Sequence, residues 1–536
     1  IARGIIDSLK PGLVQLGGVW PPFPQILYLS GVWNDFLLYS GLSGTVISIA
    51  SATLATFFIA KLTLSLTKSK LVTLTSTAVL ILNPSFLYMS VVPMSEVPFI
   101  AFVIISTYFL YRWVELKNPI YLPLAAFGAL LATLTRYEGL FLPIFSVIVI
   151  ALEGTISKEK LENIKGYIFL YASPAFAGIF LWLIYNQVIF GNLFHFVLGE
   201  TSTYSRAAGD LSGSLTKGNI INSLKSYFDG ANLNMGVISL GLTAFATMLT
   251  VILHQRKYLV PIILFSSLIV FSIISLFFGA SDIFTYSNST YLYNVRMGLF
   301  IAPLVAVSYA SLSKNKIILV IISLLFVGQA YLLFSKPPIT LQEPLNSSVL
   351  EKGIKQSELV AWLQSHPTDG KTLISFIANQ TVVFDARITL KEVISEGSGN
   401  YWSNALAYPN NQAKRVIISP MAGDILWQTT QLNKHYLDGY KESYTNKYFQ
   451  VYDLVKNDKL KTVETIQPTE TMKKLQTSPT ETSCDYTIQV GDSLWRIAKN
   501  KLGKGSYSTK IIELNKDTYF DLPTIHPGRK IVIPCT

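Results

Sequence analysis

Four ionisable side chains stand at those ends of long apolar runs that the loop charges, described below, predict to lie at the outer face of a membrane. They are Glu96, Arg136, Glu138 and Arg296. An arginine can stabilise growing negative charge and a carboxylate can take up a proton, so these residue types suit the transfer of a polar group. The alternative is that each side chain anchors a segment end at an interface, with Arg136 and Glu138 paired to each other or to neighbours.

Other chemistries find little support in the sequence. There is no nucleotide-binding fingerprint, no P-loop and no His-Glu metal motif, and the five histidines are scattered without ligand spacing. A divalent ion held by carboxylates is not indicated, and the cofactors remain unknown. The net charge of +11 lies largely in short loops between apolar runs, where membrane topology explains it. We therefore predict no nucleic-acid partner.

The positions of the apolar runs predict a membrane half and a soluble half. The chain of 536 residues is 50% apolar and only 14% charged. A helix needs roughly 20 apolar residues to cross a bilayer. About ten candidate spans satisfy or approach this length, at residues 42–60, 71–92, 97–113, 119–135, 139–152, 167–190, 236–253, 258–279, 297–313 and 317–335.

The basic residues of the loops predict the orientation of these spans. One alternating set of loops holds twelve of them: Lys61, Lys68, Lys70, Arg112, Lys117, Lys158, Lys160, Lys165, Arg256, Lys257, Lys314 and Lys316. Loops dense in lysine and arginine face the cytoplasm. We therefore expect a multi-pass protein of the plasma membrane, with residues 1–41 as a first outer loop and everything after residue 336 outside the cytoplasm.

The outer half divides into three pieces by composition. Residues 336–457 mix a helical pattern at 357–364 with strand-like runs at 372–377, 415–419 and 448–454, which predicts a small α/β domain without an assignable motif. Residues 458–483 are rich in Thr, Pro, Lys and Glu and contain almost no large apolar residue, so we expect a flexible linker. Residues 484–536 form the last domain.

That last domain resembles LysM, a glycan-binding module. Its phrases YTIQVGDSLWRIAKN, IIELNK and IHPGRKIVIP give a strand, two helices and a second strand in order, with Leu494, Ile497 and Ala498 facing inward. The resemblance implies binding of peptidoglycan or another N-acetylglucosamine glycan. The matching loops contain Gly491, Asp492, Ser493, Leu494, Asn515, Ile525, His526 and Pro527. For about half of them, a turn-forming or core role is the competing interpretation.

The only two cysteines, Cys484 and Cys535, bracket this domain. Such a pair fits a disulfide in an oxidising compartment, in agreement with the predicted outer location. In the LysM fold the two strands pair antiparallel, which would make these cysteines neighbours. Two unrelated free thiols remain the alternative.

The membrane half resembles polytopic glycosyltransferases of the GT-C fold, especially relatives of protein O-mannosyltransferases and of the aminoarabinose transferase. Five phrases carry the resemblance in order over residues 1–335: WPPFPQILYL, MSEVPFIAFVIISTYFLYRW, ALLATLTRYEGLFLPI, IFGNLFHF and YNVRMGLFIAPL. The expected fold is thus a membrane all-α, GT-C-like domain of about ten transmembrane helices at 42–335, then the α/β domain and a C-terminal LysM domain with the order β-α-α-β.

The resemblance implies an enzyme that moves one sugar from a polyprenyl-phosphate donor to an acceptor on the outer face, with the lipid bilayer and the donor lipid as partners. Arg296 is our first choice for the donor phosphate and Arg136 our second. In the family the catalytic acid lies ahead of a stretch like IARGIIDSL, which here begins at Ile1. We therefore expect the main base upstream of Ile1, with Asp7 an unconvincing substitute, and the chain as given could be inactive.

Two other functions compete with the transferase. A membrane-anchored glycan-binding protein would need fewer spans than these. A transporter of lipid-linked sugar would favour charges inside the membrane or paired broken helices, whereas the ionisable residues here gather at span ends. Only Asn83-Pro84 and scattered prolines interrupt the spans.

Overall fold

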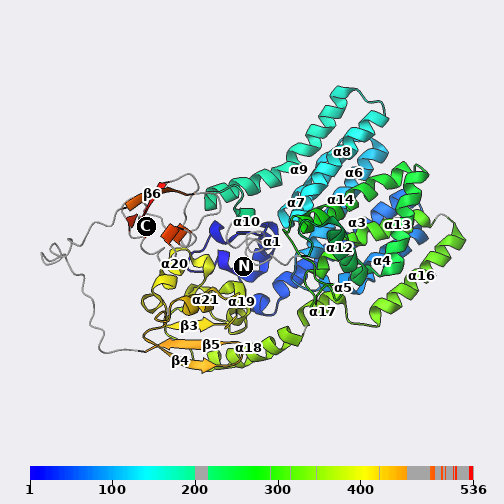
Figure 1. Ribbon diagram of the computed structural model, residues 1–536. Helices are drawn as coiled ribbons and strands as arrows, with labels where there is room; N and C mark the ends of the chain where they lie inside the picture. The colour runs from blue at the N-terminus through cyan, green and yellow to red at the C-terminus, as the bar shows by residue number, and fades with distance from the viewer. Residues whose placement is uncertain are drawn as a thin grey trace, which may run out of the picture.

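The computed structural model describes most of the chain, in two large parts (Figure 1). The residues it describes are 1–198, 215–289, 291–313, 315–345, 347–421, 423–455, 483–488, 497–498, 501–502, 511, 514–515 and 530–534. A helical bundle occupies one end of the molecule, and a smaller α/β domain lies beside it.

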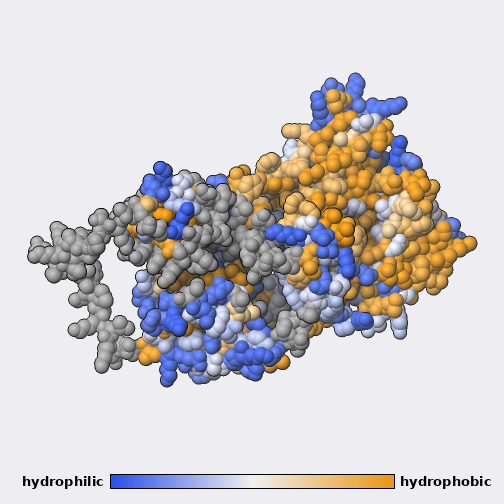
Figure 2. Space-filling view, viewed as in Figure 1, coloured by the Kyte–Doolittle hydropathy of each residue, from blue (hydrophilic) through white to orange (hydrophobic). Residues whose placement is uncertain are grey.

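The bundle is built from the apolar runs of residues 42–335. Its helices are α3 (Leu42–Thr67), α4 (Lys70–Ile81), α5 (Pro84–Met89), α6 (Glu96–Leu116), α7 (Tyr121–Thr135), α8 (Phe141–Ile156), α9 (Leu161–Phe190), α12 (Ile220–Met235), α13 (Val237–Ile252), α14 (Arg256–Phe277), α15 (Ala302–Leu312) and α16 (Lys316–Phe334). Short helices α10 (His195–Leu198) and α17 (Ile339–Gln342) follow α9 and α16. Exposed apolar side chains cover this part, as a bilayer-embedded surface requires (Figure 2).

All ten expected segments are helical, but fewer of them are regular spans. Within the described residues, seven helices are long and apolar enough to cross a membrane, or up to eight if the bent pair α12–α13 counts as one. Helices α4 and α7 are apolar but shorter. The expected span at 71–92 is two helices, because Asn83 begins a new one: its Oδ1 accepts a hydrogen bond from Phe86 N at 3.0 Å. The number ten is therefore approximate.

The charged residues of the bundle separate onto two faces. On one face, Lys68 pairs with Glu115 at 2.8 Å, and Lys257 Nζ donates to Leu66 O at 2.7 Å. Lys117 pairs with Glu153 on the same side. The opposite face adjoins the α/β domain and carries the charges described below. The structure thus supports a membrane protein with one basic face, and the direction in which that face points stays a prediction.

A close approach of two glycines fixes part of the second face. The 3₁₀ helix η4 (Val295–Ile301) lies against α12, and a Cβ added to Gly298 would lie only 2.4 Å from the carbonyl carbon of Gly230. Asn234 Nδ2 donates to Val295 O at 2.7 Å and ties the same two elements together. Asn83 Nδ2 donates in turn to Asn234 O at 2.7 Å. The backbone around Arg296 is therefore held from several sides.

The N-terminal segment, residues 1–41, forms short helices between the bundle and the α/β domain. They are η1 (Ala2–Ile5), η2 (Leu13–Gln15), α1 (Phe23–Val32) and α2 (Asp35–Tyr39). Arg3 Nη1 donates to Val32 O at 2.8 Å and holds η1 on α1. Gln15 Nε2 donates to Gly397 O at 2.8 Å, and the Tyr39 and Phe384 rings lie 5.4 Å apart. The N-terminal segment therefore joins the two parts of the molecule.

The second part is the α/β domain that the sequence predicts. Its elements are α18 (Ser347–Ser365), β1 (Thr372–Ile374), α19 (Phe376–Asp385), β2 (Val393–Ile394), α20 (Asn400–Ala407), β3 (Arg415–Ile418), α21 (Ile425–Leu432), β4 (Tyr440–Thr445) and β5 (Gln450–Leu454). The strand order is β2-β1-β3-β5-β4, with β1 parallel to β2 and β3, and with β5 antiparallel to β3 and β4.

The C-terminal part contains the predicted pair of strands. Strand β6 (Ser483–Thr487) runs antiparallel to β7 (Lys530–Pro534), and Cys484 lies opposite Ile533. Ile497 and Ala498 are buried with both strands, as expected. Leu494, Cys535 and most of the linker at 458–483 lie outside the described residues, so the disulfide and the linker stay predictions.

We expect a cysteine at Lys441, exposed on β4, to react with a membrane-impermeant maleimide in intact cells. A cysteine at Lys160, exposed between α8 and α9, should react only after the membrane is permeabilised, because positive-inside topology places it in the cytoplasm. Labelling of the chain without an introduced cysteine serves as the baseline. The reverse pattern would contradict the predicted orientation.

Gly298→Ala should lower the free energy of unfolding by about 1–3 kcal/mol, because the added methyl group overlaps the Gly230 backbone. The measurement is the temperature at which half of the detergent-solubilised protein remains monodisperse. Gly328→Ala in α16, where an added Cβ meets nothing within 4 Å, is the matched control and should leave that temperature unchanged. Equal stability of both variants would show that the close approach is not a constraint.

Candidate active site

The four ionisable residues singled out in the sequence form one network of ion pairs. Glu96 begins α6 and is fully buried, and its Oε1 accepts from Arg136 Nη1 and from Arg296 Nε, both at 2.9 Å. Arg136 follows α7, and its Nη2 lies 2.8 Å from Glu138 Oε1. The structure therefore brings together side chains that are far apart in the sequence. Whether they act in catalysis stays a prediction.

A fifth member of the network, Glu343, was missed by the sequence analysis. It begins the 3₁₀ helix η5 (Glu343–Leu345), pairs with Arg296 Nη1, and accepts from the Asn294 N–H at 3.0 Å. Glu343 lies beyond the last span, in a region taken as the start of the soluble half. Its nearness to the end of α16 was the one signal available, and it does not by itself indicate contact with a residue near η4.

Aromatic rings hold the two arginines in place. The Arg136 guanidinium lies over the Phe300 ring, with 5.1 Å from Cζ to the ring centroid. Phe300 belongs to η4 and contacts Phe99 of α6 edge to face at 5.1 Å. A cation over an aromatic face is stabilised by the ring quadrupole. The same ring thus positions Arg136 directly and, by packing η4 against α6, helps to place Arg296.

The network has spare hydrogen-bonding capacity. Among the described residues, Glu96 Oε2 and Glu343 Oε2 are buried without a partner, as are the hydroxyl groups of Tyr28 and Tyr227. Arg296 makes hydrogen bonds through Nε and Nη1, whereas no hydrogen bond from its Nη2 to the described part of the chain is found. Its side chain is 27% exposed. Because unpaired buried polar groups are costly, such a cluster suits a polar ligand.

The described residues contain no group of three or more His, Cys, Asp or Glu side chains that could hold a metal ion. The arrangement instead pairs its two guanidinium groups with three carboxylates, and Arg296 is the cation of this network for which hydrogen-bonding capacity toward an anion is left in the described part of the chain.

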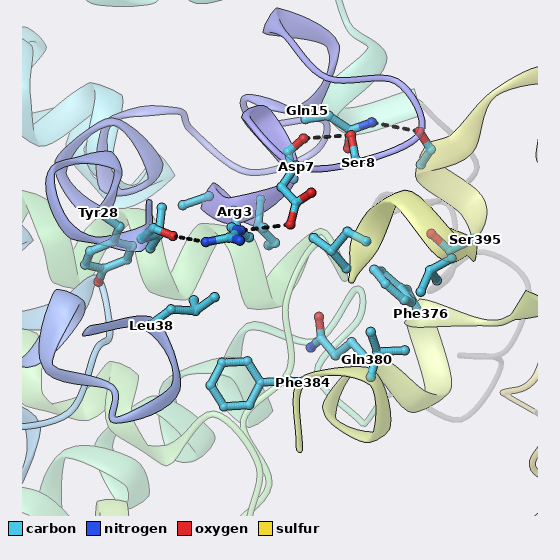
Figure 3. Close-up of a pocket in the computed structure, with 18 of the residues that line it drawn as sticks. Arg3, Asp7, Ser8, Gln15, Tyr28, Leu38, Phe376, Gln380, Phe384 and Ser395 are labelled. Carbon is cyan, nitrogen blue, oxygen red and sulfur yellow. Dashed lines mark hydrogen bonds and ion pairs between the residues drawn. The ribbon is translucent and has the colours of Figure 1, made fainter. Parts of the chain in front are cut away.

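A cavity of about 440 Å³ lies between the N-terminal segment and the α/β domain (Figure 3). Arg3, Asp7 and Tyr28 line it from one side, and Gln380 and Phe384 line it from α19. Burial raises the pKa of the Tyr28 hydroxyl, and the negative charge of Glu96 raises it further, so Tyr28 lies within the electrostatic influence of the ion-pair network. Pro93 also lines the cavity, and it precedes Glu96 by three residues, so the cavity reaches the part of the bundle that carries the network.

Asn515 is the one predicted glycan-binding residue that the structure describes. It is 1% exposed, its Nδ2 donates to Ile511 O and Val532 O at 2.6 and 2.7 Å, and its Oδ1 accepts from Val532 N. This geometry favours a role in holding β7 rather than direct contact with a glycan. Gly491, Asp492, Ser493, Leu494, Ile525, His526 and Pro527 lie outside the described residues.

Comparison with known proteins finds a family match for the C-terminal domain and structural matches for most of the chain. The LysM domain family model matches residues 486–534. No curated protein sequence matches the chain. Among solved structures, ArnT from Cupriavidus metallidurans bound to undecaprenyl phosphate matches with a TM-score of 0.55 and 11% identity, covering 85% of this chain and 92% of that one.

The apo state of the same ArnT matches with a TM-score of 0.52 and 11% identity, over 84% of this chain and 91% of that one. At this identity the likeness establishes the fold alone. The chain therefore has the GT-C-type fold of ArnT over most of its length and ends in a LysM domain, as its sequence predicts.

Proposed function

We propose that this protein is a membrane glycosyltransferase that moves a sugar from a polyprenyl-phosphate donor to a hydroxyl group of an acceptor outside the cytoplasm. The observation that carries the proposal is the buried network in which Glu96 holds Arg136 and Arg296 at one face of the bundle. The ArnT-like fold supports it, and the undecaprenyl phosphate bound in that relative supports a polyprenyl phosphate as the lipid partner here.

The chemistry follows from the charges. The acceptor oxygen forms a bond to C1 of the sugar while the bond from C1 to the phosphate oxygen breaks, and the phosphate leaves with both electrons. Arg296 lies at the partly exposed edge of the network, and its Nη2 has no bond to the described part of the chain, so we assign Arg296 to the phosphate. Preorganised cations in a water-poor site stabilise such developing charge strongly.

The glutamates have a different part. Oε1 of Glu96 and Oε1 of Glu343 each bond to Arg296, so both residues fix the direction of its guanidinium group. Their second oxygens are buried without a partner among the described residues, and either could take up the proton of the acceptor hydroxyl. Arg136 is held by two carboxylates and an aromatic ring, which favours a positioning role.

The C-terminal module extends the proposal. LysM domains are glycan-binding modules, so we propose that this domain holds the enzyme on peptidoglycan or another N-acetylglucosamine glycan of the cell wall. The linker predicted at residues 458–483 would let the LysM domain reach a nearby polymer.

Arg296→Ala should lower the rate of sugar transfer by about 100-fold or more, because it removes the cation that stabilises the leaving phosphate. The assay follows release of polyprenyl phosphate from a panel of polyprenyl-phosphate pentoses and hexoses. Arg296→Lys should recover part of the rate, since it keeps the charge.

Arg256→Ala is the matched control, because this exposed arginine begins α14 on the opposite face. Removing Arg296 leaves Glu96 and Glu343 with less compensation, so thermal stability is measured for each variant. A folded Arg296→Ala protein with the wild-type transfer rate would contradict the assignment of Arg296 to the phosphate.

Deletion of residues 484–536 should weaken retention on purified cell-wall glycan at least tenfold and leave transfer to a small soluble acceptor unchanged. The reason is that binding to the polymer and chemistry at the network lie in separate parts of the chain. Retention is measured by co-sedimentation with the glycan. Unchanged retention after the deletion would rule out the anchoring role.

A further inference from the structure

The cavity between the N-terminal segment and the α/β domain lies at a favoured position for a ligand. Strand β1 ends at Ile374, two residues before Phe376. Its parallel neighbour β2 ends at Ile394, directly before Ser395. Both Phe376 and Ser395 line the cavity (Figure 3). In open α/β sheets, ligands bind in the crevice outside the carboxyl ends of parallel strands. The volume of about 440 Å³ is typical of small-molecule sites, which span roughly 300–1,000 Å³.

The wall of the cavity combines aromatic rings with amide groups. The Tyr39 and Phe384 rings lie with their centroids 5.4 Å apart and their planes tilted by 50°, and Phe376 also lines the cavity. The Gln380 side chain is exposed on α19, while Gln15, whose Nε2 donates to Lys10 O and Gly397 O, presents its amide to the cavity from the other side (Figure 3). A sugar ring presents apolar C–H faces that pack on aromatic rings and hydroxyl groups that bond to amides, so this wall fits a sugar.

The charge of the cavity favours an uncharged ligand. Arg3 and Asp7 provide its only charged side chains among the described residues, and they pair with each other at 3.0 Å. Arg3 also pairs with Asp35 at 2.9 Å. No unpaired cationic side chain of the described part of the chain is therefore left there to hold a phosphate, whereas the neighbouring network offers Arg296. This difference separates the cavity from the proposed donor site.

The cavity extends toward the start of α6, because Pro93 and Tyr28 both line it and Pro93 lies three residues before Glu96. The buried hydroxyl of Tyr28 has no partner among the described residues. Glu96 Oε2 likewise has none. A hydroxyl group presented from the cavity at Tyr28 would thus meet spare polar atoms next to the network.

We propose that this cavity binds a neutral sugar unit of an oligosaccharide acceptor. The identification of this ligand as an acceptor rests on the proposed glycosyltransferase activity. Binding in the cavity can nevertheless be tested without transfer. Glycan would then be bound twice, by the LysM domain at a distance and by the cavity at the site of reaction.

The probe is chitotetraose carrying a diazirine, irradiated with the full-length chain in detergent and mapped by mass spectrometry. We expect labelled peptides from residues 376–390 and 28–44 in addition to the LysM domain. Phe384→Ala and Gln380→Ala should each lower labelling of these peptides at least fivefold without changing labelling of the LysM domain. In transfer assays the same variants should raise the KM for the oligosaccharide at least fivefold.

Ile377→Ala is the matched control for Phe384→Ala, because both side chains lie on α19 and are 39% and 41% exposed, but Ile377 does not line the cavity. It should label and transfer like the wild type. Labelling confined to residues 484–536 would overturn the inference, as would an unchanged KM in both variants. Labelling of the cavity in a protein that transfers no sugar even with the residues encoded upstream of Ile1 included would support the binding site and contradict the proposed function.

Discussion

The buried carboxylate of Glu96 is the constraint on which the rest of the membrane half depends. A charge removed from water costs several kcal/mol unless partners compensate it. Here the compensating charges come from two other places in the chain, Arg136 after α7 and Arg296 in η4, and Glu343 after α17 pairs with Arg296 in turn. Helix α6 cannot shift along its axis without separating Glu96 from both arginines. The ion pairs therefore fix the mutual positions of these elements at one face of the bundle.

Sequence patterns predicted the members of this network better than their arrangement. Glu96, Arg136, Glu138 and Arg296 stood out because they are ionisable residues at span ends that the predicted topology places at the outer face. Their mutual contacts could not be derived, since Glu96 and Arg296 meet only through the packing of helices that are distant in the sequence. Glu343 was missed for the same reason. Asn83-Pro84, taken only as a break in a span, supports the backbone near Arg296 through Asn234.

The fold itself was largely predictable, because apolar runs and alternating strands are local signals. All ten apolar segments are helices, and the strands at 372–374, 415–418 and 450–454 lie within the runs predicted for them. The number of regular spans was less certain from sequence, since a short helix such as α7 is stabilised by its neighbours rather than by its length. Asn515 lies in the segment that the LysM family model matches, but its polar atoms are used within the domain, which a sequence motif does not reveal.

The cavity could not have been predicted, because it exists only where three distant parts of the chain meet. The N-terminal segment, Pro93 near the start of α6 and the loops after β1 and β2 each supply one side. The charged network, in contrast, lies almost entirely in the bundle. Residues that would stabilise a phosphate and residues that would select an acceptor are thus carried by different domains. Changes in α19 or in the loop after β2 could alter the ligand of the cavity without disturbing the ion pairs around Arg296, so donor chemistry and acceptor choice can vary independently in such a fold.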